Sequence, residues 1–521
     1  MKLAGRALVA GALIVVLGVG LAPAGLTLDA GHSGLPLGRP GLPESRNTQE
    51  ITPGVTYTHI ERGFASERDF YTVDVVFTST RREAKETTLR LKRDGYRARF
   101  ERIAERAPDD PERGPLGWLV RVGRFSTSER ADAQRAELVA EGYSTARVVH
   151  TSEDGGKTTG PWIVHVLTIE PDVFQGSLEP ELATEIVPER ELLSSIAART
   201  DAVASINAGY FVIGEADGTP GDLAGISALD GELISESVAG RTSLALPAGP
   251  GEDALIAVFD TEIEASSSDG AARLVDGLNR KPGLIRSCGG RGGDQPTERP
   301  KHDVTCTDDS ELIHFTPIFG DSTEPGPGTE VVLDAAGNVV EVRTERGGSI
   351  PPDGSVLSGT SGGARWLRDH AEVGRRIEVI SSVTADGAAF PLPDGLGVVN
   401  GGPRLVRDGA VDITAFDEGF HHPENPEFYY RFGVRRNPRT LAGVTDEGDL
   451  VLIAADGRRP GYSVGLDFGE EALVMRAFDA RDAVNLDGGG STGITIGDHL
   501  VSRPSDPTGE RAIGDALVLT D

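Results

Sequence analysis

Short apolar runs separated by turn residues fill the chain from about residue 160 to its end. Gly, Asp and Pro stand between these runs, a pattern typical of strands joined by tight turns. Apolar residues take helical spacing near residues 188–198 and 470–480, and residues 483–486 predict a short buried strand. The pattern favours an α+β fold class, with a strand-rich mixed α/β domain over residues 155–521.

An internal repeat with an offset of 47 residues lies within residues 70–152. Each copy reads strand, helix, strand, with a glycine where the helix is expected to stop. Two such copies predict an inserted small βαββαβ (ferredoxin-like) domain. The matched residues are Val73, Val75, Ala84, Leu91, Gly95 and Tyr96 in the first copy, and Val120, Val122, Ala131, Leu138, Gly142 and Tyr143 in the second.

The segments on either side of the repeat indicate that this domain is inserted rather than appended. Residues 51–60 and 161–171 both read as strands that can lie side by side, so residues 51–69 are expected to hold the first strand of the domain that residues 155–521 continue. Insertion at a surface turn costs little, because loop-closure entropy grows slowly with length.

The start of the chain has the features of an export signal. Lys2 and Arg6 precede an apolar stretch, and a small-residue run ends at Ala24, so residues 1–24 are predicted to be a signal peptide. Residues 25–50, rich in Gly and Pro, are predicted to be a flexible linker. The protein is expected outside the cytoplasm, secreted or cell-wall associated, with a membrane contact if the signal is not cleaved.

The charge and the cysteine content limit the kinds of partner and cofactor that the chain is expected to bind. The 51 basic and 81 acidic residues give a net charge of -30, which argues against nucleic-acid binding. Cys288 and Cys306 are the two cysteines, and in an oxidising compartment we expect them to form a disulfide that contributes about 3 kcal/mol. No cofactor is expected: the cysteines lack zinc-site spacing, and the acidic run at residues 305–311 lacks the spacing of a calcium loop.

The strongest chemical motif is the octet at residues 485–492, in which Asp487 follows the predicted buried strand. A strand end holds a carboxylate rigidly for catalysis. Three glycines allow close backbone approach, and their N–H groups are expected to form an anion-binding concavity. The substrate-binding candidates of this octet are Gly488, Gly489, Gly490, Ser491 and Thr492.

Three further segments place a polar residue beside glycine or proline at a strand end, in residues 207–211, 400–404 and 436–440. Their amides can bind sugar hydroxyls, their guanidiniums can grip a phosphate, and Tyr210 or Phe211 can stack on a sugar ring. Glu510 supplies a second carboxylate, which cleavage at an anomeric carbon generally requires. The remaining candidates are Asn207, Gly209, Asn400, Gly401, Gly402 and Arg404 for substrate binding, and Arg439 for catalysis.

Two resemblances follow from these motifs. The repeat resembles the sporulation-related repeat (SPOR) family, whose members bind peptidoglycan glycan strands. Its net charge of +3, against -33 for the rest of the chain, fits docking on an anionic wall. Residues 400–409, 436–450, 456–461, 485–492 and 503–511 together resemble the phosphodiester glycosidase family.

The second resemblance implies an exported hydrolase that releases a sugar from a sugar-1-phosphodiester in a cell-wall or extracellular glycan. By position it implies Asp487, Glu510, Arg439 and Asn400 as site residues. The alternative is a noncatalytic cell-wall glycan-binding or architectural protein.

Overall fold

A computed structural model describes residues 34–249, 252–289 and 300–521. The predicted signal peptide lies outside the described residues. The linker prediction for residues 25–50 is wrong where the structure describes it, because Leu35, Leu37 and Leu42 are buried in the core and a strand, β1 (Glu44–Thr52), follows them. Gly and Pro around these leucines masked a packed segment. Across the described ranges, no helix combines the length and apolar character needed to cross a membrane.

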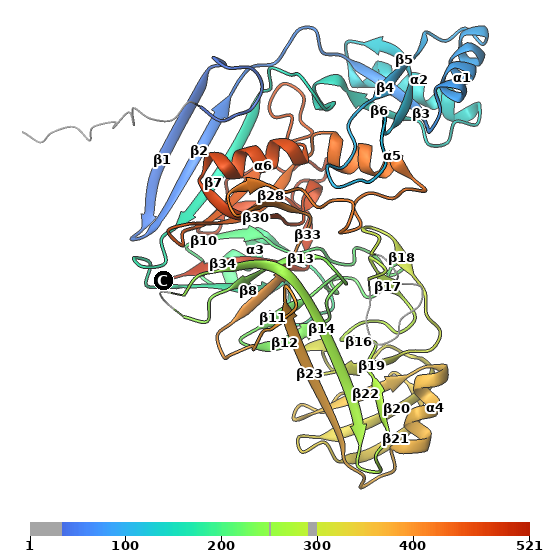
Figure 1. The fold of residues 1–521 in the computed structure, drawn as a ribbon, viewed down its shortest axis with the longest axis vertical. Helices are drawn as coiled ribbons and strands as arrows, with labels where there is room; N and C mark the ends of the chain where they lie inside the picture. Colours follow the sequence, from blue (N-terminus) through green and yellow to red (C-terminus); the bar gives the residue numbers. More distant parts are fainter. Residues whose placement is uncertain (1–33, 250–251, 290–299) are drawn as a thin grey trace, which may run out of the picture. The chain divides into compact units, whose positions relative to one another are not determined.

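An eight-stranded antiparallel sheet organises the centre of the molecule (Figure 1). Its order is β1-β2-β7-β29-β28-β30-β26-β27. The strands after β1 are β2 (Val55–Arg62), β7 (Trp162–Ile169), β29 (Leu450–Ala455), β28 (Arg439–Thr445), β30 (Ala480–Asn485), β26 (Arg404–Arg407) and β27 (Ala410–Val411).

Both faces of this sheet are covered, which is why β28 and β29 are buried at every position. The helix α6 (Phe468–Ala477) packs on one face, and Met475 is among the side chains that it buries there. Asp467 caps α6 in a capping box with Glu470. The other face packs against a five-stranded sheet of order β32-β31-β10-β34-β8. Its strands are β32 (His499–Leu500), β31 (Ile494–Ile496), β10 (Ala204–Asn207), β34 (Asp515–Thr520) and β8 (Ser177–Leu182).

Two further sheets complete the catalytic domain. The first sheet includes the long strand pair β14 and β23, which extends toward the second sheet, and the second sheet carries α4 (Figure 1). The first contains β12 (Glu232–Ser235), β11 (Ser227–Leu229), β25 (Gly397–Asn400), β13 (Thr242–Leu246), β14 (Leu255–Ser267), β23 (Ile377–Ala385), β24 (Ala388–Ala389) and β15 (Ala272–Leu274). The second contains β16 (Gly277–Leu278), β19 (Leu312–Phe315), β22 (Gly354–Gly359), β20 (Gly326–Asp334) and β21 (Val339–Arg346).

Short elements connect these sheets. The predicted helix at residues 188–198 is found as α3 (Leu193–Arg199), shorter than expected. The others are α4 (Ser361–His370), α5 (Pro426–Tyr429), the pair β9 (Glu191–Leu192) with β33 (Ala512–Ile513), the pair β17 (Ile285–Arg286) with β18 (Thr305–Cys306), and the single turns η1 (Thr151–Glu153), η2 (Pro317–Phe319), η3 (Tyr430–Val434) and η4 (Gly489–Ser491).

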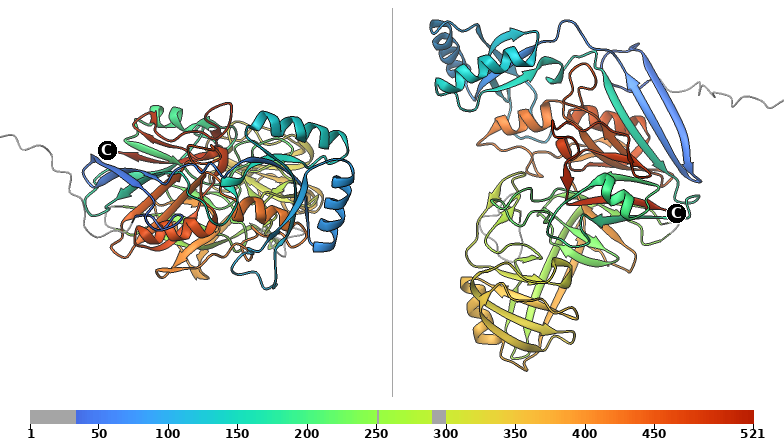
Figure 2. Two further views of the ribbon diagram at one scale, coloured as in Figure 1. Left: turned by 90° about the horizontal axis from the view of Figure 1, so that it is seen from above. Right: turned by 180° about the vertical axis from the view of Figure 1, so that it is seen from behind.

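The repeat segment folds as a four-stranded sheet of order β4-β5-β3-β6 with two helices on one face (Figures 1 and 2). The βαββαβ prediction is confirmed. Its elements are β3 (Tyr71–Thr78), α1 (Arg81–Arg93), β4 (Ala98–Ile103), β5 (Gly117–Phe125), α2 (Ser128–Ala140) and β6 (Arg147–His150). The domain lies between β2 and β7, which pair directly, Val55 opposite Ile169.

The face of this small sheet that lacks helices packs on the catalytic domain. Leu119 and Ile103 join the catalytic core, and the rings of Phe77 and Tyr430 lie 5.8 Å apart. Asp109 accepts hydrogen bonds from the backbone N–H groups of residues 416 and 417. The helix-covered face is therefore the one that the domain turns away from its neighbour.

A candidate active site at the end of β30

A cavity of about 240 Å³ opens where β30 ends and the three glycines begin. It brings together segments from across the sequence, as the motif analysis predicted for Asp487 and Arg439. The lining residues are Tyr210, Phe211, Ile213, Ala224, Arg286, Ser287, His302, Asp303, Phe432, Asn437, Arg439, Arg458, Asp487, Gly488, Gly489, Gly490 and Arg511.

Asp487 is held in place by its own backbone. Its N–H donates to the Ala208 carbonyl at 3.0 Å, and its carbonyl accepts from Asn207 Nδ2 at 2.7 Å. Burial raises the pKa of Asp487 to about 6, against the opposing effects of the Ser491 hydroxyl and the Gly488 N–H. A carboxylate that titrates near neutral pH can act as a base or support positive charge.

The glycine run does not form the predicted concavity of free amides. The Gly488 N–H donates to Asp487 Oδ1 at 2.9 Å, and the Gly489 N–H donates to the Pro438 carbonyl at 2.9 Å. The glycines instead make room for arginines. A Cβ on Gly490 would lie 2.1 Å from Arg511 Nη2, and one on Gly489 would lie 3.3 Å from Arg458 Nη1.

Among the residues that the structure describes, four guanidiniums line the cavity, those of Arg286, Arg439, Arg458 and Arg511. Each is anchored: Arg458 donates to Asn437 Oδ1 at 2.9 Å, and Arg511 pairs with Asp506 at 2.8 Å. Arg439 is buried, lies 2.6 Å from Glu471 and packs between the rings of residues 432 and 468. Anchored guanidiniums lose little entropy on gripping an anion, so this cavity is suited to phosphate despite the acidic chain.

The predicted Asn residues act behind the cavity. Asn400 Oδ1 accepts the Tyr210 N–H at 2.8 Å, and a Cβ on Gly209 would meet Asn400 Nδ2 at 2.5 Å. The Gly402 carbonyl accepts the Tyr210 hydroxyl at 2.8 Å, and Gly401 lies against the Asn485 carbonyl. These residues therefore position Tyr210. None of Asn207, Gly209, Asn400, Gly401 and Gly402 lines the cavity.

Four other predicted residues lie away from the cavity, which corrects their expected roles. Glu510 accepts the N–H and the hydroxyl of Ser194 at 2.8 and 2.7 Å at the start of α3, so it is not the second carboxylate. Arg404 is buried in β26, 3.8 Å from Asp386. Ser491 and Thr492 are buried and do not line the cavity, although the Ser491 hydroxyl lowers the pKa of Asp487.

His302 and Asp303 also line the cavity, and no sequence motif pointed to either residue. Burial lowers the pKa of His302 well below its ordinary value, so its ring is neutral, and it stacks on Phe420 with ring centres 4.4 Å apart. Asp303 lies at the cavity mouth, paired with Arg286. Neither residue lies in a periodic segment. The nearby cysteines were the available signal, since they predict an ordered loop.

Cys288 and Cys306 form the predicted disulfide, which closes the loop that carries His302. Replacing both cysteines by alanine should lower the free energy of unfolding by about 3 kcal/mol and raise KM, because the loop loses its closure. Denaturant titration and steady-state kinetics measure the two effects. Reduction of the unaltered protein should reproduce both, and an unchanged KM would contradict the role assigned to the loop.

Asp515 is a buried carboxyl close enough to Asp487 to feel its charge. Its pKa predicts that the stability of the protein depends on pH. Burial raises the pKa of Asp515 to about 7, and Asp487 adds to the rise. A raised pKa in the folded state means that stability is full below the unfolded value and falls as pH rises through about 7. Asp515→Asn should therefore stabilise the protein by up to about 4 kcal/mol at pH 8 and by little at pH 4. Urea titrations at both pH values test this; equal differences would contradict it.

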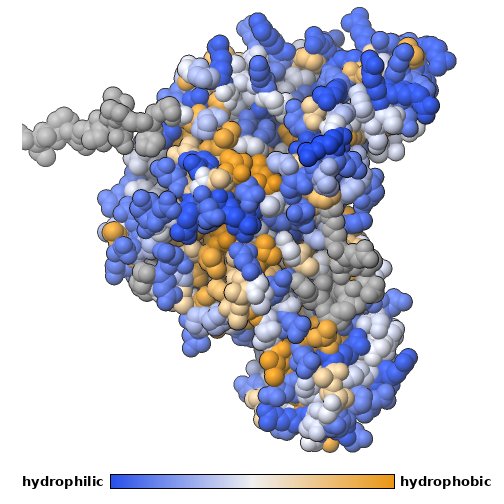
Figure 3. Space-filling view, in the orientation of Figure 1, coloured by the Kyte–Doolittle hydropathy of each residue, from blue (hydrophilic) through white to orange (hydrophobic). Residues whose placement is uncertain are grey.

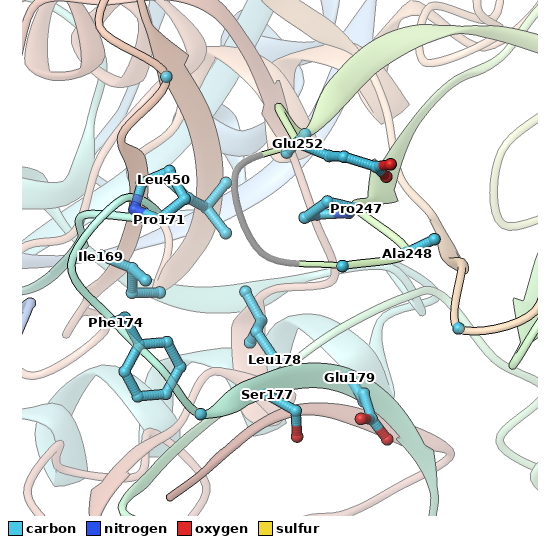
Figure 4. Close-up of a pocket in the computed structure, with 15 residues that line it drawn as sticks. Ile169, Pro171, Phe174, Ser177, Leu178, Glu179, Pro247, Ala248, Glu252 and Leu450 are labelled. Atoms are coloured by element: carbon cyan, nitrogen blue, oxygen red, sulfur yellow. The ribbon is translucent and has the colours of Figure 1, made fainter.

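A second hollow, of about 190 Å³, is apolar (Figure 4). Ile169, Phe174, Leu178 and Leu450 surround it, and the side chain of Glu179 contributes one of the carboxylates that line it. None of its described lining residues is an arginine or a lysine. It lacks the cations that a phosphate needs, so the cavity at Asp487 is the candidate site.

Metal ligands were also sought around the acidic segments. Over the ranges 34–249, 252–289 and 300–521, no three or more His, Cys, Asp or Glu side chains are arranged to hold a metal ion. Glu311 of the acidic run is buried and pairs with Arg280 at 2.6 Å.

Comparison with protein families finds two matches. Residues 328–520 match the phosphodiester glycosidase family, and residues 67–149 match the SPOR domain. Similar curated proteins are N-acetylglucosamine-1-phosphodiester alpha-N-acetylglucosaminidases. The Mus musculus protein is 30% identical over 164 residues, which are 30% of this chain and 30% of that protein. The Homo sapiens protein is 33% identical over 107 residues, 20% of each chain. The matched region thus covers less than a third of these relatives.

Solved structures resemble a much larger part of the chain. A Burkholderia pseudomallei protein described as exported superposes with a TM-score of 0.86 and 33% identity, over 94% of this chain and 98% of that one. A hypothetical protein from Synechocystis gives a TM-score of 0.54 at 18% identity, over 91% of this chain and 81% of that one, and so shares the fold.

Proposed function

We propose that this chain, which carries a phosphodiester glycosidase domain and a SPOR domain, is an exported enzyme that hydrolyses a sugar-1-phosphodiester in a cell-wall glycan. The observation that carries the proposal is the cavity in which Asp487, with its pKa raised to about 6, shares one wall with Arg439, Arg458 and Arg511. In a chain of net charge -30, such a concentration of guanidiniums fits an anionic substrate.

The roles follow from the chemistry of each group. The guanidiniums of Arg458 and Arg511 hold the phosphate and stabilise its negative charge as it leaves. Asp487, ionised at neutral pH, supports the positive charge that develops at the anomeric carbon or activates the attacking water. The bond between the anomeric carbon and its oxygen breaks, water supplies the new hydroxyl of the sugar, and the leaving group departs as a phosphomonoester.

Tyr210 and Phe211 supply an aromatic wall of the cavity on which a sugar ring can pack. The names of the curated relatives favour N-acetylglucosamine as that sugar. The SPOR domain favours peptidoglycan as the polymer to which the enzyme docks. Together with the similarity to a protein described as exported, it supports a location outside the cytoplasm.

The test is hydrolysis of a soluble sugar-1-phosphodiester by the purified protein in ¹⁸O-labelled water, with the released sugar and phosphomonoester measured by mass spectrometry. Glycosidic cleavage places the label in the released sugar. Label in the phosphate would instead indicate a phosphodiesterase and overturn the proposal. An ordinary O-glycoside of the same sugar serves as the control and should not be cleaved, because it offers the arginines no phosphate.

A noncatalytic wall-binding protein is the second candidate. It predicts binding of isolated cell wall without turnover of any sugar phosphodiester. Against it stands the geometry of the cavity, in which Asp487 lies with the guanidiniums of Arg458 and Arg511, because adhesion to a glycan does not require a carboxylate beside anion-binding groups.

A further inference from the structure

The two helices of the SPOR domain bury corresponding apolar residues, and α1 buries Thr88 in addition. Ala84 and Leu91 of α1 correspond to Ala131 and Leu138 of α2, and all four are buried. Thr80 and Thr127 cap the two helices in the same way, each accepting a hydrogen bond from a backbone N–H. The apolar contacts and the N-terminal cap are thus the same in both helices.

Their exposed positions differ in charge. In α1, six basic and two acidic residues give a net charge of +4; in α2, two basic and three acidic residues give -1. At the positions that correspond to Lys85 and Lys92, α2 has Asp132 and Val139. Because α2 folds without this positive charge, packing does not require it in α1.

The basic side chains of α1 are not neutralised by neighbours. Arg81, Arg82, Lys85, Lys92 and Arg93 are exposed, and none of them forms a salt bridge with any residue that the structure describes. The domain turns this face away from the larger domain, since the other face of its sheet packs on that domain through Leu119 and through Arg121, which donates to the Tyr430 hydroxyl. Figure 3 shows a largely hydrophilic surface over this part of the molecule.

We propose that the exposed face of α1 binds an anionic, phosphate-bearing wall polymer. Long-range attraction from the whole protein is excluded by its net charge of -30, so a polyanion must be recognised by a local cluster of cations. Phosphate oxygens are good acceptors for the mobile ammonium and guanidinium groups of such a helix. The inference deepens the proposed function, on which it rests for the assumption that this polymer carries the scissile bond.

The experiment compares two full-length variants with equal changes in charge. Lys85→Glu/Lys92→Glu reverses the charge of two exposed side chains on α1, and Arg130→Glu/Arg135→Glu reverses the charge of one exposed and one half-buried side chain on α2. Each variant is sedimented with purified cell wall that retains its phosphate polymers, and with the same wall after hydrofluoric acid has removed them. Vesicles of anionic lipid serve as a third surface.

We expect the α1 variant to bind phosphate-bearing wall at least tenfold more weakly than the unaltered protein, the α2 variant to bind normally, and binding to weaken with added salt. Equal binding by both variants, or equal binding of the unaltered protein to stripped wall, would overturn the inference. Tighter binding to the vesicles than to the wall would also overturn it, in favour of a membrane.

Hydrolysis of a small soluble phosphodiester separates this inference from the proposed function. Both variants should cleave it at the normal rate, since neither pair of residues lies near the cavity. If α1-dependent binding is found but the soluble substrate is not cleaved by any of the proteins, the proposed function fails and the binding surface stands.

Discussion

Asp487→Asn should lower kcat by roughly 10²- to 10⁴-fold and leave the protein folded. The amide keeps the hydrogen bond from the Gly488 N–H but cannot carry the negative charge that the reaction needs. Release of free sugar from the soluble phosphodiester measures the loss, and circular dichroism confirms the fold. Asp498→Asn, at an exposed turn between β31 and β32, is the matched control and should be fully active.

The pH profile gives a second readout for the same residue. Because burial raises the pKa of Asp487 to about 6 and the ionised form is the active one, kcat should rise as pH increases through about 6. The Asn variant should lose this acidic limb and keep only residual activity. Unaltered activity, or an unchanged acidic limb, would exclude Asp487 from the chemistry.

The second large effect is on stability, at the junction between the two domains. Asp154 accepts hydrogen bonds from Arg121 at 2.6 and 2.7 Å and from Arg435 at 2.5 Å. Asp154→Asn should lower the free energy of unfolding by about 3 kcal/mol at pH 7, because two buried guanidiniums lose a shared partner. The exposed Asp132→Asn, which removes a partner of Arg135, should cost less than about 0.5 kcal/mol.

At low pH, the difference in the free energy of unfolding between the unaltered protein and the Asp154→Asn variant should disappear. Burial opposes ionisation of Asp154, but Arg121 and Arg435 outweigh it and lower its pKa below 3.8. A group with a depressed folded pKa stabilises the protein above its unfolded value, and this contribution is lost as pH falls through the folded value. Denaturant titrations of both proteins from pH 7 downward should therefore converge. A constant gap at all pH values would show that packing, not charge, is responsible.

The sequence predicted those features whose signals are local. The 47-residue repeat, the disulfide and the strand leading to Asp487 each depend on short-range patterns, and each was found. The sharing of one cavity by Asp487 and Arg439 was also anticipated, because both flank buried strands, β30 and β28, that pair with one another.

The placement of the other site residues depended on three-dimensional geometry, which the spacing of residues along the chain does not encode. Arg404 and Arg439 look alike in sequence, but β26 has a bulge between Arg404 and Val406, and the guanidinium of Arg404 does not reach the cavity. Glu510 lies close to Arg511 in the chain, and only the position of Ser194 reveals that the carboxylate caps α3. His302 comes from a loop without periodicity, which gives no basis for placing it.

The position of the insertion between β2 and β7 has a topological consequence. Where the chain leaves the central sheet, Phe64 N–H donates to the carbonyl of Thr159, the residue near which it returns, at 2.8 Å. With respect to the sheet, the whole SPOR domain is therefore the loop of a β-hairpin. The register of β2 against β7 does not depend on the loop's length, so such a site tolerates the gain, loss or exchange of whole modules without reshaping the hydrolase around it.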